Sequence, residues 1–158
     1  MGQDTLGGIV FHVYHGKDGK QHGLIVSKIE GRAIMGINPF ISDSTRSWDG
    51  KFNTGLITNS PVKNWIQNNL DSNWYLPSID ELVLLWTHRF NVNKALSEGN
   101  HQLIAFLPIE KNANYWFYAY CSSNINIYNY VSVMDFHQGR TIWRSFNDEV
   151  LVRAVRSF

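Results

Sequence analysis

Several polar side chains in this 158-residue chain stand at spacings that metal sites use. His12 and His15 form an H-x-x-H pair, and histidine is a common zinc ligand. Both lie in an apolar, alternating stretch typical of a strand, where a spacing of three residues sends side chains to opposite faces. The pair therefore indicates a structural role, and we predict no metal site.

Adjacent carboxylates and adjacent serines offer acid–base or nucleophilic chemistry. Asp80 and Glu81 stand where a helix is expected to begin, and carboxylates there stabilise the helix dipole and cap. Ser122 and Ser123 need a histidine and an acid to converge on them, and the chain has no G-x-S-x-G motif. These patterns favour structural roles, so we predict no catalytic residue.

The remaining candidate motifs are weak. Two Asp-Gly turns, "HGKDG" at 15–19 and "SWDG" at 47–50, lack the regular oxygen ligands of a calcium loop. The single cysteine, Cys121, excludes an internal disulfide and any cysteine-pair motif. Arg153 and Arg156 lie three residues apart near the end, and we expect at least one to form a structural ion pair or hydrogen bond. We predict no cofactor.

The first half of the chain predicts a hairpin followed by helices. Alternation in 8–14 and 22–28 indicates two strands joined by a glycine-bracketed turn. Residues 41–55 are polar and rich in turn residues, and we expect a surface loop. A short helix should follow at 60–70, with Ser60 as N-cap and Pro61 at its first position.

A capping box gives the clearest local signal. In "PSIDELVLLW" (77–86), Ser78 precedes Glu81 by three residues and an apolar run follows. Residues 93–100 predict a further turn or two of helix that ends at Gly99. The remainder predicts strands at 116–122, 130–136, 140–146 and 150–156. This order favours one α+β domain over residues 1–158.

Composition narrows the partners. A net charge of +1 gives no bias toward nucleic acid, and no apolar run is long enough to span a membrane. The start, "MGQDTLGG", lacks the regions of a signal peptide. Aromatic residues make up 14% of the chain, so many rings must pack and others are available for contacts.

Tyrosine and asparagine are concentrated in one segment. Five of the seven tyrosines lie close together: Tyr115, Tyr118, Tyr120, Tyr128 and Tyr130. The same segment holds five asparagines: Asn112, Asn114, Asn124, Asn126 and Asn129. Tyr with Asn and Ser is typical of recognition loops, where rigid rings provide area and small polar groups adapt their hydrogen bonds. The alternative is that the rings fill a core and the asparagines form turns.

Four ordered segments resemble a known family. They are "GGIVFHVY" with "QHGLIVS", then "GKFNTGLI", then "NWYLPSIDELVLLW", and finally "YCSS" with "DFHQGR" and "VRAVRSF". The chain resembles the Lcl C-terminal domain family of bacterial and phage-borne domains. The resemblance implies a C-type-lectin-like fold with small antiparallel sheets and two helices.

The resemblance also implies a ligand-binding surface near the C-terminus. Some similar proteins are variable proteins of diversity-generating retroelements, in which adenine changes convert Asn codons into codons for residues such as Tyr, Ser, Ile and His. Residues 124–144 are rich in this set. Cys121 departs from the family pattern, which has Trp at that position of "YWSS".

Two neighbours of this fold are less favoured. Formylglycine-generating oxidases use paired cysteines, and this chain has one. Calcium-dependent sugar-binding lectins carry a motif that "FND" (146–148) partly matches, but their second calcium motif and disulfides are missing.

The resulting prediction is a compact domain whose first and last strands are adjacent. Its buried residues should be Trp65, Trp74, Leu82, Leu85, Trp86, Phe136 and Val155. In the strand after the 124–129 loop, we expect Val133 and Asp135 to point outward.

We predict a non-enzymatic receptor- or adhesion-type module that binds a protein or glycan. It would act outside the cell, at a cell surface or on a phage particle. The runner-up is an assembly subunit of a surface fibre or phage tail. An enzyme using Cys121, Ser122 or His137 is the third alternative. The predicted contact residues are Asn124, Asn126, Tyr128, Tyr130, Val133, Asp135, His137, Arg140, Ile142 and Arg144.

Overall fold

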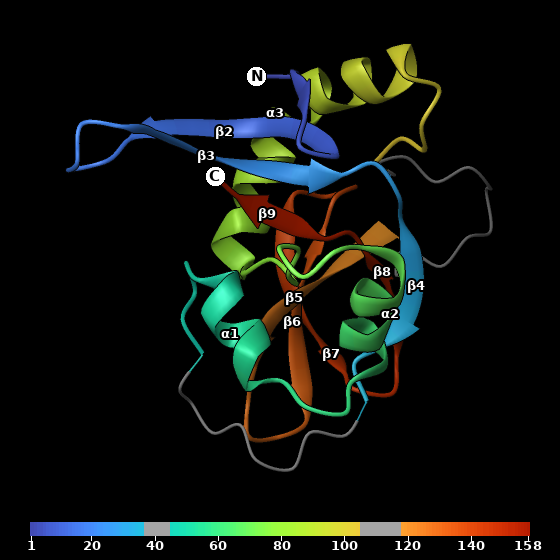
Figure 1. The fold of residues 1–158 in the computed structure, drawn as a ribbon. Helices are drawn as coiled ribbons and strands as arrows, with labels where there is room; N and C mark the ends of the chain where they lie inside the picture. Colours follow the sequence, from blue (N-terminus) through green and yellow to red (C-terminus); the bar gives the residue numbers. More distant parts are fainter. Residues whose placement is uncertain (37–44, 105–117) are drawn as a thin grey trace.

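The computed structural model describes residues 1–36, 45–104 and 118–158, and forms three helices and two sheets (Figure 1). The helices are α1 (Gly50–Leu56), α2 (Pro61–Asn69) and α3 (Ile79–Glu98). The strands are β1 (Asp4–Thr5), β2 (Gly8–His15), β3 (Gln21–Ser27), β4 (Gly31–Ile34), β5 (Ala119–Ile125), β6 (Tyr130–Asp135), β7 (Arg140–Ser145), β8 (Glu149–Val152) and β9 (Val155–Ser157). The predicted α+β class is confirmed.

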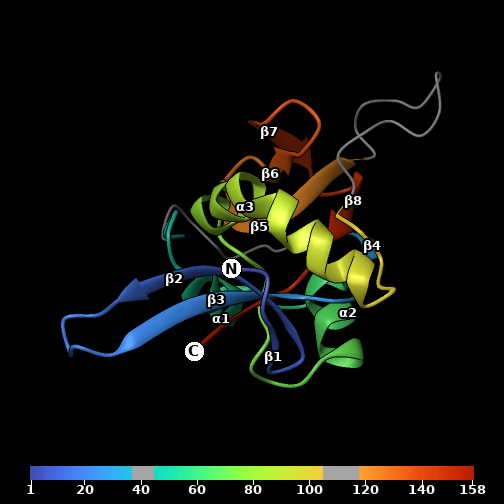
Figure 2. The same cartoon turned by 90° about the horizontal axis from the view of Figure 1, so that it is seen from above.

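The strands form two sheets. One is built from strands at the two ends of the chain, and the other mostly from strands in its C-terminal half. One sheet has the order β1-β2-β3-β9 and the other the order β4-β8-β5-β6-β7. All neighbouring strands are antiparallel except β5 and β8, which share one parallel pairing. The β2–β3 hairpin projects to one side of the molecule, and both chain ends lie by its sheet (Figures 1 and 2).

Apolar side chains on the two faces of the strands belong to two separate apolar clusters. Phe11 belongs to the cluster that includes Leu85 of α3, whereas its neighbour Val10 belongs to the cluster that includes Val62 of α2. Successive strand residues point to opposite faces, so the inner part of the hairpin is covered on both sides, while its tip is exposed. Strands β5 and β6 contribute to both clusters as well and are also buried on both faces.

The capping box positions the longest helix. Ser78 Oγ accepts the Glu81 N–H at 3.3 Å, and Glu81 Oε2 accepts the Ser78 N–H at 2.7 Å. This pair satisfies two of the free N–H groups at the helix start. The helix continues without a break to Glu98 and ends at Gly99, so the two predicted helical segments are one.

The predicted loop at 41–55 is wrong in its last part, where α1 forms. Asp49 caps this helix by accepting the Phe52 N–H at 2.9 Å. The helix has no apolar stripe, because its buried residues are Gly50, Asn53 and Thr54. Hydrogen bonds hold it instead: the Asn53 side chain accepts from Arg46 N and donates to Arg46 O. Residues 41–44 lie outside the described residues.

Helix α2 confirms the predicted helix at 60–70 with Ser60 at the N-cap position, but the Ser60 side chain makes no capping hydrogen bond. The Ser60 hydroxyl instead donates to the Met35 carbonyl at 2.7 Å. Pro61 occupies the first helical position, as predicted.

The predicted C-terminal strands are confirmed with two corrections. The first begins at Ala119 and runs to Ile125, while 116–117 lie outside the described residues. The predicted strand at 150–156 is two strands in different sheets, β8 and β9. The last strand pairs with β3 and not with the first hairpin strand, so the predicted adjacency of first and last strands is wrong.

Five of the seven predicted core residues are buried: Trp74, Leu82, Leu85, Phe136 and Val155. Trp65 and Trp86 are only partly buried and pack against the edges of the clusters. The Trp86 indole N–H donates to the Phe136 carbonyl at 3.1 Å, which ties α3 to the end of β6. An indole with a polar group to satisfy commonly lies at such a boundary.

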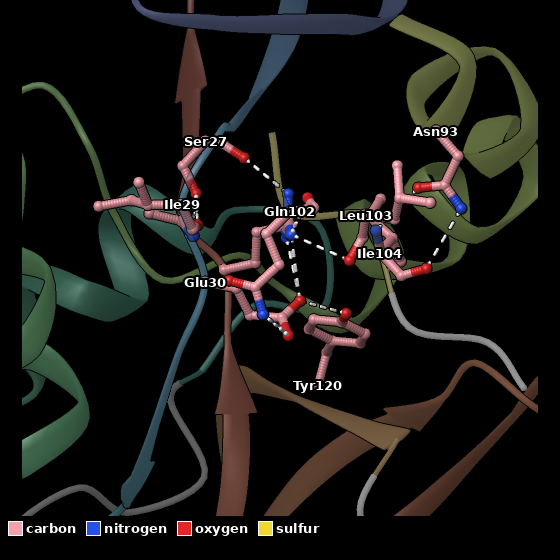
Figure 3. Close-up of polar contacts among 10 residues, drawn as sticks. Ser27, Ile29, Glu30, Asn93, Gln102, Leu103, Ile104 and Tyr120 are labelled. Carbon is pink, nitrogen blue, oxygen red and sulfur yellow. Dashed lines mark hydrogen bonds and ion pairs between the residues drawn. The ribbon is translucent and has the colours of Figure 1, made fainter. Parts of the chain in front are cut away.

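A buried ion pair lies where the chain passes from β8 to β9. Arg153 is 0% exposed, and its guanidinium donates to Ser27 O at 3.0 Å, to Gln102 O at 2.9 Å and to Glu30 Oε2 at 3.2 Å. The Tyr120 hydroxyl donates to the same Glu30 oxygen. Figure 3 shows Glu30, Gln102 and Tyr120 grouped around this point. The expectation that one of the two arginines is structural is confirmed.

Replacing this arginine by a neutral side chain of similar length should be costly. We expect Arg153→Met to lower the free energy of unfolding by about 3–5 kcal/mol, because Glu30 would remain buried without its counter-charge. Urea unfolding followed by tryptophan fluorescence measures the loss. Arg156→Met is the matched control, since Arg156 pairs at 3.6 Å with the exposed Asp71 and should lose at most about 1 kcal/mol. Equal losses for the two variants would contradict this account.

Candidate functional site

A tight turn between β5 and β6 carries the most exposed tyrosine of the predicted site. Tyr128 is 72% exposed at the turn, which lies at the end of the molecule away from the β2–β3 hairpin (Figure 1). Asn126 Oδ1 accepts the N–H groups of Tyr128 at 2.9 Å and Tyr130 at 3.1 Å. Asn129 adopts φ = 63°, a left-handed conformation that asparagine tolerates. The ring is thus exposed on a backbone that side-chain hydrogen bonds hold in place.

The edge strand β7 adds a second exposed ring on the same side as Tyr130. Tyr130 pairs with Ser145 and Ser132 pairs with Trp143, so Trp143 and Tyr130 are diagonal neighbours on one face. Such neighbours lie about 7–8 Å apart, which is within reach of aromatic side chains. Trp143 is 54% exposed. We call the exposed side chains of Ile127, Tyr128, Tyr130 and Trp143 the turn-and-edge surface.

The ten predicted contact residues do not form one face. Three are exposed: Tyr128, Tyr130 and Arg140. Four are partly buried: Asn126, His137, Ile142 and Arg144. Three are buried: Asn124, Val133 and Asp135. The pairings Val133 with Ile142 and Asp135 with Arg140 put these residues on the opposite face from Tyr130.

The prediction that Val133 and Asp135 point outward is wrong. Strand β6 lies inside its sheet and is covered on both faces, so alternation exposes neither side. Val133 belongs to the same apolar cluster as Cys121. Asp135 accepts the N–H groups of His137 at 3.0 Å and Gln138 at 3.1 Å, and therefore shapes the turn to β7.

Asn124 also has a structural position. Its side-chain oxygen accepts the Ile79 N–H at 2.8 Å, and its amide nitrogen donates to the Arg46 carbonyl at 3.0 Å. The residue thus joins β5 to the start of α3 and to the segment before α1. These bonds satisfy a buried amide, as buried polar groups require.

The tyrosine-rich segment serves both the core and the surface. Tyr118 and Tyr120 are buried, and the Tyr120 hydroxyl bonds to Glu30. Tyr115 and the two asparagines at 112 and 114 lie outside the described residues. The core interpretation therefore holds for the rings at 118 and 120, whereas those at 128 and 130 are exposed and available for contacts.

Sequence reasoning did not include Ile127 and Trp143 in the predicted site. Both are exposed large apolar side chains. Trp143 stands between Ile142 and Arg144 in the strand. Those two residues were predicted to lie on the contact face, so alternation placed Trp143 on the opposite face and left it out of the predicted site. No sequence signal marked its exposure, which follows from the position of β7 at the edge of its sheet.

Candidate nucleophiles lie in the core. Burial raises the pKa of the Cys121 thiol, which keeps it protonated and unreactive. The Ser122 hydroxyl donates to the Ser132 carbonyl at 2.6 Å, and Ser123 Oγ accepts from the Asn53 amide at 3.1 Å. These hydroxyls serve as structural bonds between β5 and its neighbours.

His12 and His15 differ in exposure. His12 stacks on Tyr14, with ring centroids 5.7 Å apart, while His15 is exposed at the end of β2. Over residues 1–36, 45–104 and 118–158, no group of three or more His, Cys, Asp or Glu side chains is arranged to hold a metal ion. None of the helices in these ranges is long and apolar enough to cross a membrane.

No family model matches the chain, and no curated protein is significantly similar to it. The resemblance to the Lcl C-terminal domain family stays a prediction.

Removing the Asn126 acceptor should loosen the turn without unfolding the domain. In Asn126→Ala, we expect the Tyr128 and Tyr130 amides to exchange with solvent about fivefold faster, the effect of losing a bond of about 1 kcal/mol. Hydrogen exchange followed by NMR measures the rates. Asn126→Asp keeps an oxygen at the Oδ1 position, which can accept both N–H groups, and should exchange like the wild type. Unchanged rates in Asn126→Ala would show that the side chain does not hold the turn.

Proposed function

We propose that the protein is a non-enzymatic binding module whose turn-and-edge surface contacts a protein or glycan ligand. The observation that carries the proposal is the exposure of Ile127, Tyr128, Tyr130 and Trp143 on a hydrogen-bonded turn and its neighbouring edge strand. Large apolar groups gathered at the surface commonly mark interaction sites.

The turn is already held by hydrogen bonds, which suits a binding site better than a flexible surface loop would. Ordering a loop on association costs free energy, and a turn already held by Asn126 avoids much of that cost. Tyrosine and tryptophan add large area with few rotatable bonds. The arrangement suits contact with a broad partner surface.

The finer fold prediction is part of the same proposal. A C-type-lectin-like fold is supported by the sharing of one sheet between the N-terminal hairpin and the last strand, β9. It is further supported by a second sheet formed largely from the C-terminal half, with helices beside it. On this proposal the domain acts outside the cell, at a cell surface or on a phage particle.

An assembly subunit of a fibre or phage tail is the second candidate. The observation that favours it is the position of β7 at the end of its sheet, where its outer edge has no strand partner in the described part of the chain. An open edge can pair with another chain. In that role Trp143 and Tyr128 would contact a neighbouring copy.

A binding screen tests the proposal. Arrays of purified surface proteins and glycans are probed with wild type and with Tyr128→Ala/Trp143→Ala. We expect a ligand whose affinity falls about thirtyfold in the double variant, the effect of removing an aromatic anchor worth about 2 kcal/mol. Phe90→Ala removes a ring that is 77% exposed on α3 and is the matched control. Equal binding by all three proteins, or self-association lost only in the double variant, would contradict the binding role.

Diversification by a retroelement would leave a separate trace, namely differences among homologous copies of this protein. If residues 124–144 are diversified, copies should differ mainly at exposed positions such as Tyr128 and Tyr130. Buried positions such as Val133 should stay apolar, because a polar residue there would be buried without a partner. Sequencing of the copies checks this. Copies identical across the segment would refute diversification and leave the binding proposal standing.

A further inference from the structure

A cleft of about 320 Å³ lies between the β2–β3 hairpin and the segments that begin α1 and α3. Its walls include Tyr14, Trp48, Tyr75, Asp80 and Glu81. None of its lining residues belongs to the turn-and-edge surface. Its volume falls at the lower end of the range of small-molecule sites. The cleft is therefore a separate candidate for ligand binding.

Trp48 is the most exposed aromatic wall of the cleft, and its backbone is held on both sides. Its side chain is 68% exposed. The preceding Ser47 bonds twice to Asp80: the Ser47 hydroxyl donates to the carboxylate at 2.7 Å, and the Ser47 carbonyl accepts the Asp80 N–H at 3.0 Å. The following Asp49 caps α1. The backbone that carries the exposed indole is therefore held in place before any ligand arrives.

Tyr14 is held by its neighbours as well. Its ring centroid lies 5.7 Å from that of His12 and 5.6 Å from that of His22. His22 is fixed in turn by Asp18, whose carboxylate oxygens lie 3.0 and 3.1 Å from its Nε2 atom. Two half-exposed or exposed rings, Tyr14 and Trp48, thus offer flat apolar faces at the cleft.

The polar lining mixes acceptors with donors. Asp49, Asp80 and Glu81 supply carboxylates, of which Asp49 pairs with Arg46 at 2.9 Å, and Lys51 supplies an ammonium group. Glu81 Oε1 accepts a hydrogen bond from the Tyr75 hydroxyl at 3.0 Å, and burial raises the pKa of this carboxyl. Burial and the nearby His88 lower the pKa of His12, which favours its neutral imidazole.

This lining matches a ligand that is neutral, polar at its edge and apolar on its face. Asp49 is already paired with Arg46, and burial favours the neutral form of Glu81, so an anion would meet Asp80 and a cation would meet Lys51. A sugar ring has hydroxyls that both donate and accept hydrogen bonds and a C–H face that packs on aromatic rings. The volume also accommodates one or two such rings.

We propose that this cleft binds a neutral sugar residue, with the ring packed on Trp48 and Tyr14 and its hydroxyls bonded to Asp80 and Lys51. The site is independent of the turn-and-edge surface. The protein would therefore carry two binding sites, one broad and one that takes a small ring.

Saturation-transfer-difference NMR tests the site with defined probes. The probes are the methyl glycosides of glucose, galactose, mannose and N-acetylglucosamine, with choline and glucuronate as charged comparisons. We expect at least one neutral glycoside to bind and both charged probes to bind more weakly. Trp48→Ala should weaken the best glycoside about tenfold or more, as the loss of an aromatic contact does, and Trp48→Phe should restore most of the affinity. Because the side chain is exposed, neither change should unfold the domain.

Tyr128→Ala/Trp143→Ala is the matched control, since it removes exposed rings from the other surface only. It should bind the glycoside like the wild type, so failure of this site and failure of the proposed function are distinguishable. The site would be refuted if no glycoside binds, if choline or glucuronate binds more tightly, or if Trp48→Ala binds like the wild type. Loss of binding in the double variant would place the sugar on the turn-and-edge surface and equally refute the cleft.

Discussion

The fold depends on the pairing of one buried arginine. A guanidinium has five donors and is always charged, so burial is tolerated only if acceptors surround it. Arg153 finds them on segments that are far apart in sequence: the end of β3 at Ser27, the carboxylate of Glu30 and the carbonyl of Gln102. Tyr120 of β5 shares the same carboxylate. Since Arg153 stands between β8 and β9, these bonds hold the junction of the two sheets (Figure 3).

The placement of the sheets decides which side chains reach solvent. Strands β5 and β6 are covered on both faces, so their own side chains contribute little surface. Exposed apolar groups are found instead at the turn after β5 and on the edge strand β7, where Tyr128 and Trp143 stand. Asparagine side chains hold these segments, because their oxygens accept backbone N–H groups in place of a backbone carbonyl. Asn124 binds the start of α3, and Asn126 holds the turn.

Features set by short-range chemistry could be predicted from the sequence. The capping box at Ser78, the proline that opens α2 and the hairpin are local patterns with local causes. Helix α1 could not be predicted, because Asn53 holds it through hydrogen bonds to Arg46 and no apolar period marks it.

The candidate site could be predicted only in part, because long-range packing decides which of its residues are exposed. Alternation states which residues share a face, but not how many faces are covered. Val133 was therefore placed outward although β6 has a core on each side. The exposed turn at Tyr128 was predicted correctly, because a polar, asparagine-rich turn has no core to join. Trp143 was missed because the position of β7 at the sheet edge follows only from the strand order.

The central claim is that the scaffold presents Tyr128 and Tyr130 on a backbone that is rigid before any ligand binds. Backbone order parameters from ¹⁵N relaxation of the free protein measure this directly. The account predicts values near 0.85 for residues 126–130, equal to those of β6 and typical of rigid backbone. Values below about 0.6 in this turn, beside a rigid β6, would contradict it.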